Sequence, residues 1–411
     1  MACAKILVLF FSVVVHCEFN FVAIGDWGGE NDQEPVTESQ RETAAAMMRN
    51  SKDFNADFAL MMGDNYYHHG VNCPADVSPR FKETFEDVYA AVLPNGTFYA
   101  FAGNHDYGEG LLSNISAQLA YSSTSRNWNF PSLWYSLRRN FTAEGKKRTV
   151  KLIIIDTVVL CGNGAADAGF IDRQLEFLGQ KADPARPGHL REVLAERQWT
   201  WLERELEEAS ATDYLWVSGH YPIYSAGNDG SQQCLIDRLL PLIQSHRAQY
   251  ISGHDHMLEH IVIGDTNMFV AGAGKECCYE PVNLHQVPLG AMKFMVAGWH
   301  GQLSEPALTK PVLGGFASLH FGADFATVAL HSQTGEVLYT APRIPRRAAA
   351  PVFIVSDAVS EPAQHSMASQ FTIGGIGLVL LCISICVAIP MLVHYRRQRS
   401  CFKGYVLLEA A

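Results

Sequence analysis

Five short polar stretches flanked by glycine place the strongest constraint on how this chain can fold. Most of them directly follow an apolar run that predicts a buried strand. Because loops after strand ends can bring side chains together on a rigid scaffold, we expect these stretches to converge on one site. They are Gly25-Asp26-Trp27-Gly28-Gly29, Gly63-Asp64-Asn65-Tyr66-Tyr67, Gly103-Asn104-His105-Asp106, Gly219-His220-Tyr221-Pro222 and Gly253-His254-Asp255-His256.

Together these stretches supply carboxylate, phenol, amide and imidazole groups. The candidate metal ligands are Asp26, Asp64, Tyr67, Asn104, His220, His254 and His256. Each of them alone also fits an ordinary turn, cap or buried structural residue. The pair His254 and His256 is the most informative, since a spacing of two places both side chains on one side of an extended segment. The set is large enough for two metal ions, an arrangement that serves displacement at phosphorus.

Strand-like and helical patterns alternate along the chain and predict a body that mixes both. Predicted strands span residues 19–24, 58–62, 98–102, 134–137, 149–155, 214–217, 248–251, 268–271, 292–296, 316–320 and 325–331. Predicted helices span residues 38–50, 80–89 and 190–209. The segment from Gly162 to His189 is poor in strand-forming residues and contains Pro184 and Pro187. A long loop is expected there, either a functional lid or an ordinary surface excursion.

Both ends of the chain carry apolar segments that predict membrane targeting. The first fits a secretory signal peptide cleaved after Cys17, with a buried first strand as the alternative. The second is uncharged, long enough to cross a bilayer and followed by basic residues, which place the C-terminus in the cytosol. The sequence therefore predicts a type I membrane protein. Its parts are a signal peptide at 1–17, a lumenal body at 18–345, a stalk at 346–370, a transmembrane helix at 371–393 and a cytosolic tail at 394–411.

Composition agrees with a folded protein of an oxidising compartment. Apolar residues make up 48% of the chain, and the net charge of −11 argues against a nucleic-acid partner. An odd number of cysteines falls in the lumenal body, so at least one thiol is free or paired outside the chain. These cysteines are Cys73, Cys161, Cys234, Cys277 and Cys278. Glycosylation sequons occur at Asn95, Asn114 and Asn140.

The order of the glycine-flanked stretches also carries a resemblance to a known family. Further segments extend it: Ala117-Gln118-Leu119-Ala120-Tyr121, Trp128-Asn129-Phe130-Pro131, Asp156-Thr157, Cys161-Gly162-Asn163 and Gly314-Gly315-Phe316-Ala317. Over residues 19–345 the chain resembles the small, animal-type tartrate-resistant (purple) acid phosphatases, within the calcineurin-like metallophosphoesterases. The resemblance implies an α+β fold, a four-layer α/β/β/α sandwich of two mixed sheets flanked by helices. One C-terminal transmembrane helix would follow it.

The resemblance implies a role for each candidate ligand. The implied ferric ligands are Asp26, Tyr67 and His256, the implied ligands of a divalent partner are Asn104, His220 and His254, and the implied bridging carboxylate is Asp64. The family's Gly-Asp-x-x-Tyr pattern selects Tyr67 rather than Tyr66. Hard anionic donors suit Fe(III), and imidazoles suit a divalent ion, with Fe(II) foremost and zinc or manganese as alternatives. Cys161 and Cys234 match a pair that the family joins by a disulfide.

The implied activity is that of an acid phosphatase. A metal-bound hydroxide would attack phosphate monoesters, as small molecules or phosphoproteins, in an acidic compartment. His105 would lie near the substrate and assist the departing alcohol, since an imidazole is largely protonated at lysosomal acidity. The family has a second histidine nine positions after the one matching His220, where this chain has Asp229. Asp229 is therefore the second candidate catalytic residue. His68 and His69 have no family counterpart and are expected to be loop residues near the cleft.

Two segments outside the ligand set carry further expectations. The loop at 162–189 is longer than the family's regulatory loop, so we expect it to cover part of the site until proteolysis near Arg186. After the predicted membrane helix, Tyr405 to Leu408 fits a Tyr-x-x-apolar signal, which a clathrin adaptor binds as an extended peptide. This signal predicts delivery to the endosome and lysosome membrane, with the catalytic domain in the lumen and the cell surface as a second location.

Two other functions fit parts of the same pattern. A phosphodiesterase or nucleotide phosphohydrolase would use the same scaffold, since a fold does not fix a substrate. A non-catalytic surface receptor or adhesion protein would retain the fold alone, but the complete set of ligands argues against it. Comparing turnover of an aryl phosphate with that of an aryl phosphodiester separates the two enzymatic interpretations.

Overall fold

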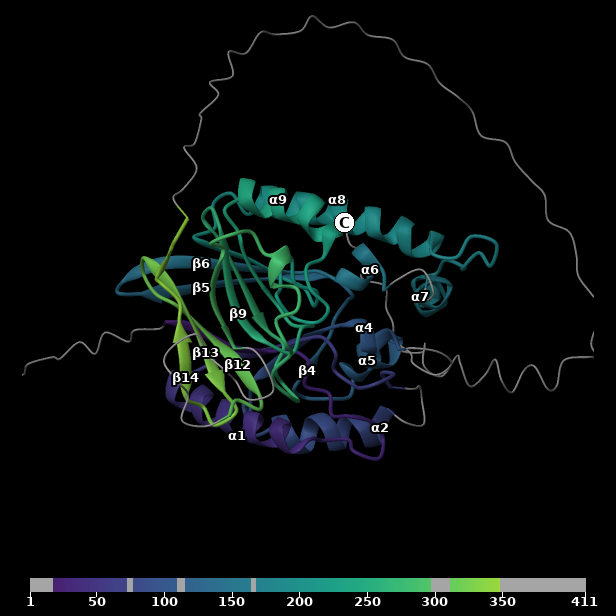
Figure 1. Ribbon diagram of the computed structural model, residues 1–411, viewed down its shortest axis with the longest axis horizontal. Helices are drawn as coiled ribbons and strands as arrows, with labels where there is room; N and C mark the ends of the chain where they lie inside the picture. Colours follow the sequence, from purple (N-terminus) through teal and green to yellow (C-terminus); the bar gives the residue numbers. More distant parts are fainter. Residues whose placement is uncertain (1–17, 72–76, 109–114, 164–167, 297–310, 348–411) are drawn as a thin grey trace, which may run out of the picture.

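Two β-sheets stacked face to face, with helices on their outer sides, form the body of the protein (Figure 1). The computed structural model describes residues 18–71, 77–108, 115–163, 168–296 and 311–347. The predicted signal peptide, membrane helix and tail, most of the stalk, Cys73 and Asn114 lie outside these residues. Within the described ranges, no helix combines the length and the apolar character needed to cross a bilayer.

The first sheet is built around the first three predicted strands. Its order is β14-β13-β12-β1-β2-β3-β4, and β15 pairs with β13. Strands β1 to β4 are parallel, whereas β12 lies antiparallel to β1. Every residue of β1 and β2 is buried, as expected for parallel strands covered on both faces. The strands are β1 (Phe19–Ile24), β2 (Phe58–Met62), β3 (Thr97–Phe101), β4 (Trp128–Asn129), β12 (Gly315–Phe321), β13 (Phe325–Ser332), β14 (Val337–Thr340) and β15 (Ile344–Pro345).

The second sheet contains the predicted hairpin and the strands of the middle of the chain. Its order is β11-β9-β10-β8-β7-β6-β5. Strands β6, β7, β8 and β10 are parallel to one another, and the edges are antiparallel. The strands are β5 (Tyr135–Ala143), β6 (Lys146–Ile154), β7 (Tyr214–Ser218), β8 (Gln249–Ser252), β9 (Leu258–Ile263), β10 (Thr266–Ala271) and β11 (Met292–Val296).

Helices cover the two outer sides of this pair of sheets. In Figure 1, α1 (Glu38–Phe54) runs along one side, and α8 (His189–Glu208) with α9 (Leu240–Ser245) runs along the other. Thr37 starts α1 with a capping box, because its side chain accepts from the Gln40 backbone while the Gln40 side chain accepts from the Thr37 backbone. The remaining helical segments are α2 (Val77–Arg80), η1 (Phe81–Glu86), α3 (Asp87–Tyr89), α4 (Asn104–Tyr107), α5 (Ile115–Tyr121), α6 (Thr157–Cys161), α7 (Ala168–Leu175), η2 (Glu176–Leu178), η3 (Leu235–Leu239) and η4 (Leu284–Gln286).

Aromatic side chains fill the space between the two sheets. The Phe21 ring stacks on Phe58 at 4.6 Å and on Phe321 at 5.7 Å between ring centroids. From the second sheet, Trp216 and Tyr214 contact Phe321 at 6.1 and 5.3 Å. Full burial of one such apolar side chain contributes roughly 1.5–3 kcal/mol, so this layer is a major source of stability. It holds the two sheets, and hence their loops, in a fixed relation.

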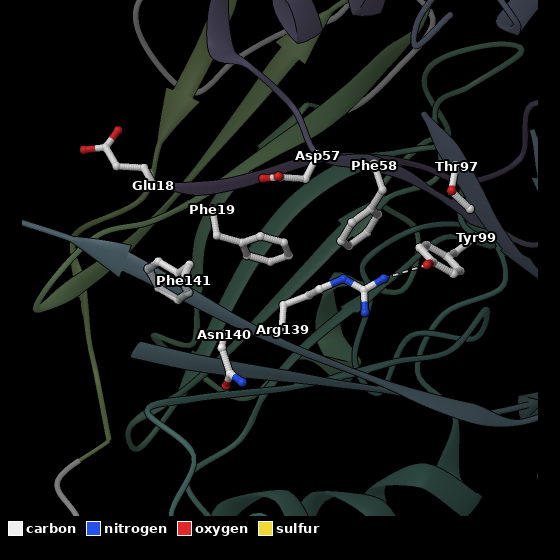
Figure 2. A pocket seen from close by; sticks show the side chains of 9 residues that line it. All are labelled: Glu18, Phe19, Asp57, Phe58, Thr97, Tyr99, Arg139, Asn140 and Phe141. Carbon is white, nitrogen blue, oxygen red and sulfur yellow. Dashed lines mark hydrogen bonds between the residues drawn. The ribbon is translucent and has the colours of Figure 1, made fainter. Parts of the chain in front are cut away.

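A cavity of about 300 Å³ lies at the amino-terminal ends of β1, β2 and β3. Phe19, Phe58 and Thr97, each the first residue of its strand, line it, and the Arg139 guanidinium donates to the Tyr99 hydroxyl at 2.7 Å (Figure 2). Three of the glycine-flanked stretches follow the opposite, carboxyl-terminal ends of these strands, and the other two follow β7 and β8. The cavity is therefore separate from the predicted site.

The structure corrects several predictions of secondary structure. The segment from Gly162 to His189 is not one long loop, because α7 and η2 lie within it and Asp172 of α7 caps the start of α8. The Asp172 carboxylate accepts from the backbone of Gly188 at 2.7 Å and of Arg191 at 2.8 Å. Helix α1 continues beyond the predicted residue 50 and ends where Asn55 takes a left-handed conformation. Strands β4, β9, β14 and β15 and helices α5, α6 and α9 were not predicted.

Candidate metal centre

The polar stretches predicted from the sequence meet at the carboxyl-terminal ends of five strands. Loops that follow neighbouring parallel strands open on the same edge of a sheet, and the two stacked sheets bring both edges together. Asp26 follows β1, Asp64 and Tyr67 follow β2, Asn104 and His105 follow β3, His220 follows β7, and His254 and His256 follow β8. The structure therefore assembles all seven predicted ligands at one place.

The Tyr67 hydroxyl is the meeting point of the first group of donors. It lies 3.0 Å from Asp26 Oδ1, 3.0 Å from Asp64 Oδ2 and 2.9 Å from His256 Nε2. The Asp26 and His256 side chains also approach each other, with 3.6 Å between Oδ1 and Nε2. A phenol, two carboxylates and an imidazole thus point at one another in a buried space, and their oxygen and nitrogen atoms could together bind a metal ion.

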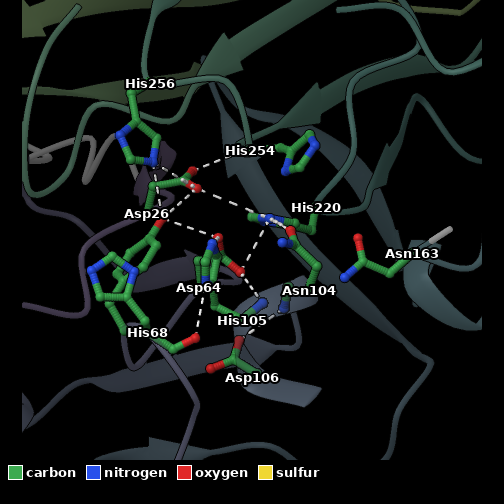
Figure 3. A network of polar contacts seen from close by, with 12 residues as sticks. Asp26, Asp64, His68, Asn104, His105, Asp106, Asn163, His220, His254 and His256 are labelled. Carbon is green, nitrogen blue, oxygen red and sulfur yellow. Dashed lines mark hydrogen bonds and ion pairs between the residues drawn. The ribbon is translucent and has the colours of Figure 1, made fainter. Parts of the chain in front are cut away.

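The second group of donors lies on the other side of Asp64. His220 Nε2 is 3.3 Å from Asp64 Oδ1 and 3.1 Å from Asn104 Oδ1. Asp64, His220 and His254 each offer a ligand atom within 4.8 Å of the others, close enough to share one metal ion. Figure 3 shows Asp64 between Asp26 and His256 on one side and Asn104, His220 and His254 on the other. A carboxylate in that position can contact two ions at once.

Close backbone packing permits this density of side chains. A Cβ atom at Gly103 would overlap the Asp64 carboxylate and lie 2.7 Å from His220 Nε2, and one at Gly253 would lie 2.5 Å from Asp26 Oδ2. The glycines beside the ligands therefore leave the space that the ligand atoms occupy.

Left-handed backbone conformations aim several ligands into the site. Among the described residues, six that are not glycine have positive φ, and three of these are Asp26 (58°), Asp64 (49°) and His254 (75°). Such conformations are uncommon for residues with a Cβ, and they cluster at functional sites where the surrounding fold enforces them. Strain of this kind supports a functional rather than a structural role for the three side chains.

Buried charges in the site are strongly coupled. Burial disfavours the Asp64 carboxylate, but the nearby imidazoles of His220 and His105 outweigh it and hold the pKa of Asp64 well below its usual range. Burial likewise opposes the charged form of His220, yet the carboxylates of Asp64 and Asp26 raise its pKa to about 10. Burial and the same two carboxylates raise the pKa of the Tyr67 phenol well above its usual value. The protonation of each of these buried groups therefore depends on its neighbours, and a metal ion would compete with protons for the same ligand atoms.

Hydrogen bonds from outside the ligand set orient the histidines. His220 Nδ1 donates to the carbonyl of Met62 at 2.8 Å, which leaves Nε2 facing the site. His256 Nδ1 lies 2.8 Å from Glu276 Oε1, so its Nε2 faces Tyr67. Burial, followed by the charge of His220, lowers the pKa of His254 well below its usual value and keeps this imidazole neutral. All three histidines therefore present a nitrogen suited to binding a metal, and the residues present fit a metal centre.

The predicted catalytic residues lie at the edge of this centre. His105 Nδ1 donates to the carbonyl of His68 at 2.8 Å, and its Nε2 lies 3.9 Å from Asp64 Oδ2. Asp229 is exposed, and its backbone N–H donates to Asp255 Oδ1 at 2.9 Å. Although the residue is exposed, desolvation of its carboxyl and the charges of Asp26 and Asp64 raise the pKa of Asp229. The side chain therefore lies within electrostatic reach of these two predicted ligands. His68 pairs with Glu30 at 2.8 Å.

Several residues around the ligands were not predicted. Glu276 contacts His256, the Tyr279 ring stacks on the His256 ring at 4.5 Å, and the Lys275 Nζ lies 4.5 Å from the centroid of the Tyr67 ring. They follow the glycines at 272 and 274, directly after β10, and this position is the signal that could have revealed them.

Two disulfides lie in the described part of the chain. Cys161 is joined to Cys234, the pair that the resemblance implied, with 5.8 Å between Cα atoms. The bond holds the start of the 162–189 segment, and Figure 3 places Asn163 beside the Asn104 side of the site. The other disulfide joins Cys277 to its neighbour Cys278. Pairing of these two was left open by the sequence.

Comparison with known proteins agrees with this geometry. The family profile described as calcineurin-like phosphoesterase matches residues 19–258, a range that includes all seven predicted ligands. Tartrate-resistant acid phosphatase type 5 from Sus scrofa is 36% identical over 331 residues, which cover 80% of this chain and 87% of that protein. The chain belongs to the purple acid phosphatase family. The protein of the same name from Homo sapiens is 36% identical over 333 residues, covering 80% of this chain and 91% of that protein.

A solved structure shares the fold of this chain, and family membership bears on its metal content. A chain titled "GAP50 the anchor in the inner membrane complex of Plasmodium" superposes with a TM-score of 0.60 at 23% identity, covering 81% of this chain and 90% of that chain. That likeness shows a shared fold. Members of the purple acid phosphatase family carry a binuclear metal centre, and the group formed by Asp64, His220 and His254 is a candidate metal site in this member.

Proposed function

We propose that the protein is a binuclear-metal acid phosphatase that hydrolyses phosphate monoesters in an acidic lumenal compartment. The observation that carries the proposal is the convergence of Asp26, Asp64 and His256 on the Tyr67 hydroxyl, all within 3.0 Å. A cluster of anionic oxygens without a cation is costly in a buried space, so these residues favour a bound metal. The similarity to acid phosphatases supports the same conclusion.

The donor types suggest how two ions would be shared. Phenolate and carboxylate oxygens favour Fe(III), whereas neutral imidazoles and an amide suit Fe(II), zinc or manganese. When bound, the ions would lower the pKa of coordinated water and neutralise charge on the phosphoryl group. Under this proposal Fe(III) would be held by Asp26, Tyr67 and His256, the divalent ion would be held by Asn104, His220 and His254, and Asp64 would serve both.

His105 would supply the proton to the departing alcohol. Its Nδ1 is fixed by the His68 carbonyl, and its side chain is 23% exposed, so Nε2 remains available at the edge of the centre. General acid catalysis of this kind contributes about 10²–10⁴-fold to a rate.

Asp229 would assist in a pH-dependent way. Its raised pKa means that the carboxyl retains a proton to higher pH than an ordinary aspartate. A protonated carboxyl at the edge of the proposed metal centre can donate a hydrogen bond to the phosphate or to the oxygen of the leaving group. The ionised carboxylate would repel the phosphate. We therefore propose that Asp229 favours activity at acidic pH.

The proposal also includes the cellular location and membrane topology of the enzyme. The apolar segment at 371–393 and the basic residues after it support a type I anchor with the catalytic body in the lumen of endosomes or lysosomes. The Tyr405–Leu408 signal supports recognition by a clathrin adaptor. Small phosphomonoesters or phosphoproteins are the proposed substrates.

Colour provides the test. The full-length protein, purified in detergent, is expected to contain iron, to show a purple or pink tyrosinate-to-iron band and to hydrolyse an aryl phosphate at mildly acidic pH. Tyr67→Phe should bleach the band. Tyr66→Phe, which removes the hydroxyl of the adjacent tyrosine instead, should leave the band unchanged. A colourless, iron-free and inactive wild-type protein would refute the proposal. Faster turnover of an aryl phosphodiester would favour the phosphodiesterase alternative.

A further inference from the structure

A buried lysine lies beside the tyrosine of the proposed ferric site. Lys275 is only 3% exposed, and its Nζ sits over the Tyr67 ring, 4.5 Å from the centroid. Its backbone N–H donates to the Asp26 carbonyl at 2.8 Å, and its carbonyl accepts from the Thr37 hydroxyl at 2.8 Å. These bonds tie Lys275 to the loop after β1 and to the start of α1, so the ammonium is held at a fixed distance from the ring.

Two carboxylates hold the Lys275 ammonium from its other side. Glu30 pairs with Nζ, and Glu276 Oε1 lies 3.1 Å from it. The same Glu276 oxygen lies 2.8 Å from His256 Nδ1. The Lys275 ammonium therefore lies over the phenol ring of one proposed ligand, and Glu276 links that ammonium to the imidazole of another.

Fixed charges in this position act on the electronic properties of a ligand. A cation over an aromatic face attracts the ring's π electrons, and more strongly when the ring carries the charge of a phenolate. In a buried site this attraction is screened much less than at the surface. Charges and hydrogen bonds around a metal's ligands are known levers on its reduction potential. Lys275 would withdraw electron density from Tyr67, whereas Glu30 would partly cancel that effect.

We propose that Lys275, held by Glu30 and Glu276, weakens electron donation from Tyr67 to the ion bound there and so makes that ion easier to reduce. The inference rests on the proposed function, since it concerns the ferric site. Its consequence is that the Tyr67 charge-transfer band lies at higher energy, and the reduction potential of the ion is more positive, than in the same site without the lysine.

Absorption spectra and reductive titrations of the iron-loaded, full-length protein test this inference. Lys275→Met should move the band to longer wavelength and lower the midpoint potential, because it removes the ammonium and keeps an unbranched side chain one atom shorter. Lys275→Arg should leave both near the wild-type values. Glu30→Gln should move both in the opposite direction, because it leaves the ammonium less neutralised. Lys293→Met removes an exposed lysine on β11 and should change neither.

The possible results separate this inference from the proposed function. A colourless wild-type protein would overturn both. A coloured wild type whose band and potential are unchanged by Lys275→Met, at equal iron content, would overturn this inference and leave the phosphatase assignment standing. If Lys275→Met fails to fold or load iron, Glu30→Gln decides the matter: a shift to shorter wavelength supports the inference, and an unchanged band or a shift to longer wavelength contradicts it.

Discussion

At the scale of single residues, the site depends on side chains that are allowed to approach one another unusually closely. Gly103 is the clearest case, because it lies against both Asp64 and His220. We predict that Gly103→Ala lowers metal affinity by at least about 10–100-fold, the loss typical when the support of a ligand is disturbed. Metal content after equilibration with a competing chelator measures this.

Gly169→Ala is the matched control for Gly103→Ala. Gly169 lies in α7, and its Cβ would meet the Pro187 side chain at an ordinary 3.4 Å. This variant should keep wild-type metal content. Equal metal retention by both variants would show that the Asp64 and His220 side chains can keep their close positions without a glycine at residue 103.

His105 tests the proposed division between metal ligands and the proton donor. We predict that His105→Asn lowers kcat on an alkyl phosphate by about 10²–10⁴-fold, because the leaving alkoxide loses its proton source. The loss should be smaller for an aryl phosphate with an acidic leaving group. Metal content should stay unchanged, since His105 is not among the proposed ligands. Loss of metal together with activity would instead assign His105 to the metal centre.

At the residue scale, the sequence was most informative where short motifs carry the geometry. Five of the seven proposed ligands directly follow a glycine after a strand end, and Tyr67 and His256 lie in the same short stretches. Such loops meet at one edge whatever the details of packing. Lys275 and Glu276 could not be predicted in the same way. Their contacts with Tyr67 and His256 depend on β10 lying next to β8 in the folded sheet, a pairing that local sequence does not reveal.

At the scale of elements, strands with a largely apolar sequence were predictable, and β9, which has two adjacent buried ionisable residues, was not. β1 and β2 were predicted with their observed bounds because every side chain is buried. β9 was missed because Glu259 and His260 interrupt its apolar pattern, although both are buried. Glu259 accepts from the Ala226 backbone at 3.0 Å, and the His260 ring stacks on Phe269 at 4.3 Å. Only the tertiary structure provides these partners.

Glu259 of β9 should make stability depend on pH. Burial and the Asp255 carboxylate raise its pKa to about 8, whereas in an unfolded chain it is about 4.3. Below about pH 4.3 the group is protonated in both states and its contribution is fully present. As the pH rises towards 8, only the unfolded chain ionises, so the free energy of unfolding falls, by up to a few kcal/mol. Glu259→Gln should flatten this part of the dependence, measured by thermal unfolding between about pH 4 and 8.

Glu208→Gln supplies the control for Glu259→Gln, since Glu208 is an exposed glutamate at the end of α8. It should keep the wild-type slope of melting temperature against pH. A slope that is the same in Glu259→Gln as in the wild type would show that Glu259 ionises alike in the folded and unfolded states.

At the scale of the whole molecule, the distribution of buried acids agrees with the proposed acidic location. Burial also raises the pKa of Asp156 to about 6, with the Tyr107 hydroxyl donating to it at 2.6 Å. Asp156 follows β6 and Glu259 lies within β9, both strands of the second sheet, and both residues retain protons that an unfolded chain would lose above about pH 4. A net charge of −11 also becomes smaller as exposed carboxylates are protonated. The body is therefore expected to be more stable in an acidic lumen than at neutral pH.

The destination of the molecule depends on a few residues of the tail, in the sequence beyond the described part. Tyr405 has Leu408 three positions later, as a Tyr-x-x-apolar signal requires, whereas Tyr395 has Gln398 at that place. We predict that Tyr405→Ala moves the protein from vesicles to the cell surface, because an adaptor binds the tyrosine and the apolar residue in separate pockets. Tyr395→Ala should leave the distribution unchanged, and both variants should keep wild-type phosphatase activity. Surface biotinylation measures the shift, and vesicular staining retained by Tyr405→Ala would contradict the signal.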